Sequence, residues 1–241
     1  MQLELIEINC QAPPNGNYIR KKPNIIQCSI LKGSEEYDLL LKRASALASL
    51  VNPAAANASN EERSTDRILL DAFGGVLAEA GWLQYINSEF GPIASSTPFV
   101  TAMHQIDIRF SDGELAEVRS SFPRNGVKFA LCFTSRNFKN IGPYANQVKP
   151  GEVQKHLYLG VLFDTQKKEL MSDEQVMLSL VGGSTWSMMV KIGHNVDLVP
   201  EDGFVQSRSI YKVIEFKDAL DVLGILEAIE ALGYKRKKIR K

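Results

Sequence analysis

The sequence is short of the features that mark several large protein classes. Its 28 basic and 28 acidic residues balance, so the chain as a whole has no basic signature of nucleic-acid binding, and any such surface must be a local patch. No stretch approaches the roughly 20 apolar residues of a membrane span. A Gly-x-Ser-x-Gly elbow and a Rossmann fingerprint are also missing, which sets aside serine hydrolases and dinucleotide enzymes.

Cysteine and histidine are sparse as well. The three cysteines, Cys10, Cys28 and Cys132, are widely spaced with no CxxC pair, so we expect three reduced, mostly buried thiols rather than a disulfide framework or a zinc site. Residues 1–8 are acidic and alternating, whereas a signal peptide begins with basic and then continuously apolar residues, so we expect a cytoplasmic protein. Three histidines have no ligand spacing and are expected to be structural: His104, His156 and His194.

The sequence does contain enough apolar residues for a substantial core. Hydrophobic residues make up 44% of the 241 residues, which suits one large domain or two small ones. Alternating or continuous apolar runs predict strands, and apolar residues at three- and four-residue steps predict helices. The result is a mixed α/β protein with a central mixed β-sheet flanked by helices. Strands are predicted at residues 3–8, 24–30, 104–110, 115–120, 156–163 and 210–216, and helices at 37–51, 67–87, near 126 and at 218–232.

A predicted hairpin at residues 105–119 carries the most informative pattern. Asp107 lies on the polar face of its first strand, and Glu117 and Arg119 share one face of the second. A two-residue turn would set polar side chains opposite apolar ones along the whole ladder. A three-residue turn at 111–113 instead pairs Asp107 with Glu117, makes both faces coherent, and places Gly113 at the left-handed position. We therefore predict the three-residue turn.

In that register two carboxylates face each other with Cβ atoms about 5 Å apart, which is destabilising unless something offsets the repulsion. The candidates are a divalent cation, a raised pKa or the nearby arginines. A site rich in carboxylate oxygen suits magnesium or manganese, which bind one or two carboxylates together with a substrate phosphate.

These residues resemble the PD-(D/E)xK nucleases, which have a restriction-endonuclease-like core. In that family a strand Asp and the Glu of Glu-x-Lys on the next strand hold magnesium, and the Lys activates or positions the attacking water. Asp107 and Glu117 match the two acids. The first half of the motif is absent, because Gln105 and Ile106 precede Asp107. The family also often has a Glu on the preceding helix, where this chain has Glu79.

The resemblance implies a single domain whose nuclease-like core spans about residues 64–164, with residues 1–60 and 165–241 as elaborations packed on it. It further implies a Mg²⁺- or Mn²⁺-dependent endonuclease that acts on nucleic acid, DNA above all, and often as a homodimer. Glu79, Asp107 and Glu117 would be the metal ligands. Gly75, one turn before Glu79, would let the helix lie close to the sheet.

Arg119 stands where the family has Lys, and this departure leaves three readings open. Arginine keeps its proton at ordinary pH, so it clamps a phosphate well but is a poor general base. Arg119 could serve as an electrostatic helper, or Lys128 on the following helix could supply the amine. Alternatively, catalysis is lost and the chain is a non-catalytic nucleic-acid-binding or assembly subunit on a degenerate nuclease fold.

The same residues also allow purely structural interpretations. Asp107 and Glu117 could be exposed residues on the solvated face of an ordinary hairpin, with Glu117 and Arg119 forming a surface salt bridge worth little. Glu79 alone is more often a helix surface residue. Residues 182–185, Gly-Gly-Ser-Thr, could present backbone amides to a phosphate, but a turn is the favoured interpretation because the lysine and spacing of a P-loop are missing.

Overall fold

The computed structural model describes residues 1–11, 18–51, 64–98, 107–122, 125–134, 138–144, 153–198 and 209–237. The described strands form two sheets. The larger is mixed and has seven strands in the order β1-β2-β8-β7-β5-β4-β3, with β5 and β7 parallel and the other pairs antiparallel. The smaller has three antiparallel strands in the order β6-β10-β9.

The strand bounds of the large sheet are β1 (Gln2–Glu7), β2 (Asn24–Leu31), β3 (Ala94–Ser96), β4 (Ile108–Phe110), β5 (Leu115–Ser121), β7 (Leu157–Phe163) and β8 (Gln175–Thr185). Those of the small sheet are β6 (Lys139–Tyr144), β9 (His194–Leu198) and β10 (Ser209–Glu215). The helices are α1 (Glu35–Leu50), α2 (Thr65–Phe90), α3 (Val127–Cys132), α4 (Trp186–Lys191) and α5 (Val222–Ala231), with 3₁₀ turns at Lys167–Glu169 and Phe216–Asp218.

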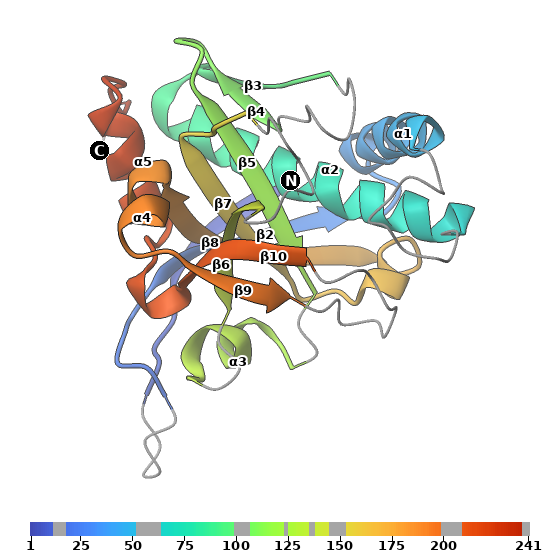
Figure 1. The fold of residues 1–241 in the computed structure, drawn as a ribbon. Helices are drawn as coiled ribbons and strands as arrows, with labels where there is room; N and C mark the ends of the chain where they lie inside the picture. Colours follow the sequence, from blue (N-terminus) through green and yellow to red (C-terminus); the bar gives the residue numbers. More distant parts are fainter. Residues whose placement is uncertain are drawn as a thin grey trace.

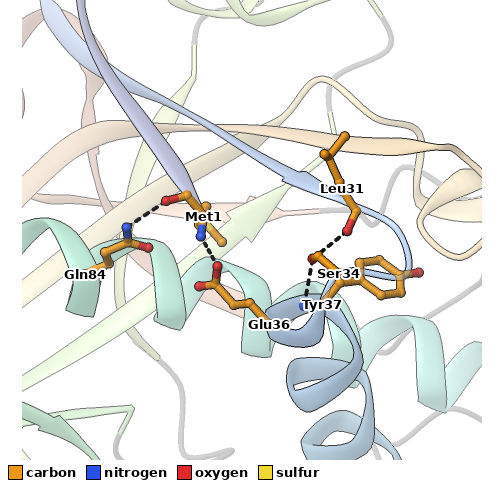
Figure 2. Close-up of polar contacts among 6 residues, drawn as sticks. All are labelled: Met1, Leu31, Ser34, Glu36, Tyr37 and Gln84. Carbon is orange, nitrogen blue, oxygen red and sulfur yellow. Dashed lines mark hydrogen bonds and ion pairs between the residues drawn. The ribbon is translucent and has the colours of Figure 1, made fainter.

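Serine side chains begin the two long helices. The Ser34 hydroxyl accepts the backbone N–H of Tyr37 at the start of α1, as Figure 2 shows, and the Ser64 hydroxyl accepts that of Arg67 at the start of α2. Each cap satisfies one of the backbone donors that a helix leaves unpaired at its N-terminus. The serine caps therefore fix where both helices begin.

Strand β1 is fastened to both long helices. The N-terminal amine of Met1 contacts the Glu36 carboxylate on α1, and Gln84 of α2 donates to the Met1 carbonyl oxygen at 2.7 Å (Figure 2). These contacts help to hold α1 and α2 together on the same side of the sheet (Figure 1).

The alternating side chains of β7 divide the core between the two faces of the large sheet. Leu157, Leu159 and Val161 point toward α1, α2 and α5 in the main cluster. Tyr158 and Leu162 point the other way, where α3, α4 and the three-stranded sheet pack. The molecule is thus a mixed sheet with helices on both faces and a second small sheet added to one of them (Figure 1). No described helix is long and apolar enough to cross a membrane.

Most of the predicted elements are confirmed within a few residues. The buried run predicted at 156–163 is β7, all of whose residues are buried. The last helix begins later than predicted, because the Asp221 side chain caps it by accepting the N–H of Gly224. The short elements β3, β6, β9 and α4 were not predicted. Residues 104–106 of the predicted hairpin lie outside the described residues.

The predicted register of the hairpin is confirmed. Ile108 pairs with Ala116 and Arg109 with Leu115, and the N–H of Phe110 donates to the Glu114 carbonyl oxygen at 2.8 Å. The turn therefore contains three residues, 111–113. Gly113 has φ 96°, the left-handed conformation that this turn requires. Continuing this register by one residue places Asp107 opposite Glu117.

The expected role of Gly75 is wrong. It lies on the exposed side of α2, and a Cβ at this position would meet nothing within 4 Å. The close approaches are at Gly74, where a Cβ would lie 3.1 Å from the Phe122 ring, and at Gly81, where it would lie 3.1 Å from Leu180. The helical period of 3.6 residues places Gly74 and Gly81 on the packed side of α2 and turns Gly75 toward the exposed side.

The turn favoured for residues 182–185 is also wrong, because these residues are the last ones of strand β8. The strand has a bulge between its pairings with Gly160 and Val161, and Gly182 has φ 94° there. Gly183 exchanges two backbone hydrogen bonds with Leu220, just before α5. The glycines let the chain entering α5 lie directly against β8, which leaves no space for a phosphate.

We expect Gly182→Ala to destabilise the protein by about 3 kcal/mol, because it adds steric overlap to backbone strain. A Cβ at Gly182 would lie 2.0 Å from the Leu220 carbonyl oxygen. Gly113→Ala is the matched control, since φ there is 96° but nothing lies within 4 Å, and it should lose only about 1 kcal/mol. Urea unfolding of both variants measures the difference. Equal losses would show that the contact with Leu220 contributes nothing.

The expectation of three free thiols is wrong. Cys10 and Cys132 form a disulfide with Cα atoms 5.2 Å apart, and only Cys28 is a free, buried cysteine. The two cysteines are 122 residues apart in the sequence, so only the fold brings them together. Near the disulfide, the N–H of Ile19 donates to the carbonyl oxygen of Cys132 at the end of α3. Because disulfides are uncommon in cytosolic proteins, this bond counts against the cytoplasmic location predicted from sequence.

Candidate active site

The candidate site lies where β5 runs past the end of β4. Asp107 directly precedes β4, and its Oδ2 accepts the backbone N–H of Val118 at 2.7 Å. The carboxylate thus takes a hydrogen bond that a backbone carbonyl would accept if the ladder continued. This bond holds the Asp107 side chain beside Glu117.

The two faces of β5 separate apolar from charged side chains. Ala116 and Val118 point into the core beneath α2, whereas Glu117 and Arg119 point to the opposite face, beside the small sheet. Glu117 is only 7% exposed. The interpretation of Glu117 as an exposed residue on a solvated hairpin face is therefore wrong.

Two cations neutralise Glu117. Arg119 contacts its Oε1, and the Lys155 amine lies 3.1 Å from its Oε2. Lys155 lies two residues before β7 and is 3% exposed, so its charge is as deeply buried as that of its partner. A buried carboxylate with two cations is a stronger electrostatic feature than a surface pair, because the low local dielectric screens it less.

Arg119 is held from the other side by two aromatic rings of the small sheet. Its guanidinium carbon lies 5.6 Å from the centroid of Tyr144 on β6 and 5.7 Å from that of Tyr211 on β10. Burial by itself lowers the pKa of Arg119, but the charge of Glu117 and the neighbouring tyrosines outweigh it, so the pKa is raised. Arg119 therefore keeps its proton and can act only as a cation.

Glu79 sits on the helix side of the sheet. It is 7% exposed on α2, and its two oxygens accept hydrogen bonds of 2.8 and 3.0 Å from Nη2 of Arg43 on α1. The charge of Asp107 helps to raise the pKa of Glu79, but the direct hydrogen-bond partner of Glu79 is Arg43. Glu79 and Glu117 thus approach Asp107 from opposite faces.

Burial shifts both Glu79 and Asp107 toward the protonated form. Burial raises the pKa of Glu79 to about 7, although the hydrogen bond and charge of Arg43 oppose the shift. Burial and then repulsion from Glu117 raise the pKa of Asp107 to about 6, although the N–H of Val118 and the nearby cations oppose it. The repulsion that the hairpin register predicted is therefore present.

A raised carboxylate pKa makes stability depend on pH. The folded state holds the Glu79 proton more tightly than the unfolded chain, so this contribution is present at low pH and is lost as pH rises through about 7. Glu79→Gln imitates the protonated acid. We expect the difference in the free energy of unfolding, variant minus wild type, to rise by about 2 kcal/mol as the pH increases from 5 to 8. Urea unfolding at both pH values, with the exposed Glu35→Gln as control, checks this, and a pH-independent difference would contradict it.

Asp107 and Glu117 are the residues that suit a divalent cation. Magnesium binds through hard oxygen ligands, often one or two carboxylates completed by water and substrate phosphate, and half-buried Asp107 and buried Glu117 supply carboxylate oxygens of this kind. No group of three or more Asp, Glu, His or Cys residues in the described parts of the chain is arranged to hold a metal ion.

The structure brings Asp107, Glu117 and Arg119 together, places Glu79 on the other face of the sheet within reach of the Asp107 charge, and leaves Lys128 out. Glu79, Asp107, Glu117 and Arg119 are linked by contacts or by charge, whereas Lys128 lies exposed on α3 and forms no described ion pair with these acids. The lysine that lies beside Glu117 is Lys155. Sequence reasoning missed it because it stands in an irregular segment with no motif, although its position just before a wholly apolar strand was visible.

Comparison of the chain with protein-family models, curated proteins and solved structures finds no significant match.

Proposed function

We propose that the protein is a metal-dependent nuclease that hydrolyses phosphodiester bonds, with DNA as its expected substrate and a homodimer as its expected form. The observation that supports this most strongly is the pairing of half-buried Asp107 with buried Glu117 beside the cations Arg119 and Lys155. Two acids that repel each other, next to two cations, are the components needed to bind a divalent cation and a phosphate together.

The order of elements supports the same proposal. Helix α2 is followed by the antiparallel strands β3, β4 and β5, then by α3, by β6 of the small sheet, and by β7, which lies parallel to β5. This is the order of helix, strands, helix and buried strand for which residues 64–164 resemble the restriction-endonuclease-like core. In this arrangement Asp107 directly precedes the middle strand of the three, and Glu117 lies on the third.

In the proposed mechanism each side chain has one task. Asp107 and Glu117 would hold the cation, and Glu79 influences the charge of Asp107 from the helix side. A divalent cation held there would lower the pKa of its bound water and neutralise charge on the phosphate. Arg119 stays in place beside Glu117 and contacts the phosphate oxygens, and Lys155 is the amine that orients the attacking water.

Cleavage of nucleic acid tests the proposal. Supercoiled plasmid, single-stranded DNA and RNA are incubated with the protein in magnesium, in manganese and in EDTA. We expect cleavage of DNA with either metal and none in EDTA. Failure to cleave any of the three substrates with either metal would contradict the proposal.

A second candidate function is supported by the balance of charge in the site. The described ion pairs join two carboxylates to three cations, with Arg43 on Glu79 and both Arg119 and Lys155 on Glu117, and Asp107 adds a third carboxylate to the site. Such a network is neutral without a metal ion and suits a non-catalytic nucleic-acid-binding or assembly subunit. DNA binding of equal strength in magnesium and in EDTA, without cleavage, would favour it.

A further inference from the structure

The small sheet reaches the candidate site through two tyrosines. Tyr144 and Tyr211 are register partners on β6 and β10, with ring centroids 4.5 Å apart and planes tilted by 37°. Both rings lie within 6 Å of the Arg119 guanidinium carbon, which comes from the large sheet. Arg119 is therefore the point at which the two sheets meet the acidic pair.

We propose that Tyr144 and Tyr211 are positioning residues that hold the Arg119 guanidinium at the edge of the metal-binding pair, so that the three-stranded sheet is part of the active site. The inference deepens the proposed function and rests on it. It assigns a role to two residues, on β6 and β10, that lie outside the motif linking Asp107, Glu117 and Arg119.

The physical reason is the freedom of the arginine side chain. Arginine has several rotatable bonds, and an ion pair with one carboxylate leaves the guanidinium plane free to turn. Two electron-rich ring faces attract the cation and restrict it from the side away from Glu117. When a phosphate competes with Glu117 for Arg119, the rings keep the guanidinium in place rather than letting it follow either anion.

The first test compares variants that remove or keep the rings. We expect Tyr144→Leu/Tyr211→Leu to lower kcat for DNA cleavage by roughly tenfold with little change in KM, because the lost contact orients a group that stabilises charge in the transition state. Tyr144→Phe/Tyr211→Phe keeps both rings and should retain most of the activity. Tyr18→Leu is the matched control, since Tyr18 packs on Phe133 with centroids 4.3 Å apart, away from Arg119.

The second test does not depend on activity. The Nε–H signal of Arg119 in a ¹H–¹⁵N spectrum is identified by its loss in Arg119→Lys. Ring currents should shift it upfield in wild type and in the Phe variant, and it should move downfield in the Leu double variant and part of the way in Tyr211→Leu alone. The Tyr18→Leu control should leave it unmoved.

The outcomes separate the two claims. An Arg119 signal that stays in place in the Leu variants overturns the inference whatever the activity, and so does a kcat equal to that of Tyr18→Leu. If wild type cleaves no nucleic acid, the proposed function fails on its own, and the Arg119 signal still decides whether the tyrosines hold the guanidinium.

Discussion

Asp107→Asn is expected to lower magnesium-dependent DNA cleavage by about a thousandfold, or roughly 4 kcal/mol of transition-state stabilisation. The substitution keeps the shape of the side chain but removes the charge that the proposed cation needs. Thermal stability should not fall, because burial and repulsion from Glu117 already disfavour the Asp107 charge. Initial cleavage rates of plasmid DNA at saturating magnesium measure the effect.

Asp112→Asn is the matched control for this variant. Asp112 is exposed in the turn of the same hairpin, where its Oδ1 accepts the N–H of Glu114, and asparagine can accept the same bond. Its activity should equal that of wild type. Equal activity of Asp107→Asn and Asp112→Asn would remove Asp107 from the mechanism.

Lys155→Met is expected to lower cleavage by about a hundredfold, whereas Lys128→Met should stay within about twofold of wild type. Lys155 is buried 3.1 Å from Glu117, and Lys128 is exposed on α3. Methionine approximates the length of the lysine stem, so both variants remove mainly the charge. The comparison decides between the lysine that sequence indicated and the lysine that the structure places beside the acid.

The opposite ranking, with Lys128→Met inactive and Lys155→Met active, would contradict the geometry of the site. A fold defect in Lys155→Met is detected separately by urea unfolding, because removing one partner of a buried ion pair is destabilising. Arg119 still neutralises Glu117 in this variant, so we expect a folded protein with low activity.

The parts of the site that sequence predicted are those set by local pattern. The alternation of apolar and polar residues and the position of Gly113 were sufficient to choose the three-residue turn, and the turn alone fixes the pairing of Asp107 with Glu117. Arg119 followed from its position two residues after Glu117. The helix and strand types followed in the same way, because each depends on periodicity within one segment.

The parts that were missed depend on contacts between distant segments. Lys155, Arg43 and the two tyrosines reach the site from four different segments of the chain, and no local pattern connects them with Asp107. The Cys10–Cys132 bond likewise joins residues 122 apart. The short strands β3 and β9 have too few residues to show a period, and their pairing partners define them.

Calorimetric titration of Mg²⁺ at pH 6 into wild type and Asp107→Asn tests the metal centre most directly. Two buffers of different ionisation enthalpy report protons released on binding. The pKa of Asp107 is about 6, so a cation bound there should displace a fraction of a proton per site from wild type. We predict Mg²⁺ binding with proton release in wild type and loss of both in Asp107→Asn. No binding to wild type, or the same binding to the variant, would contradict the account.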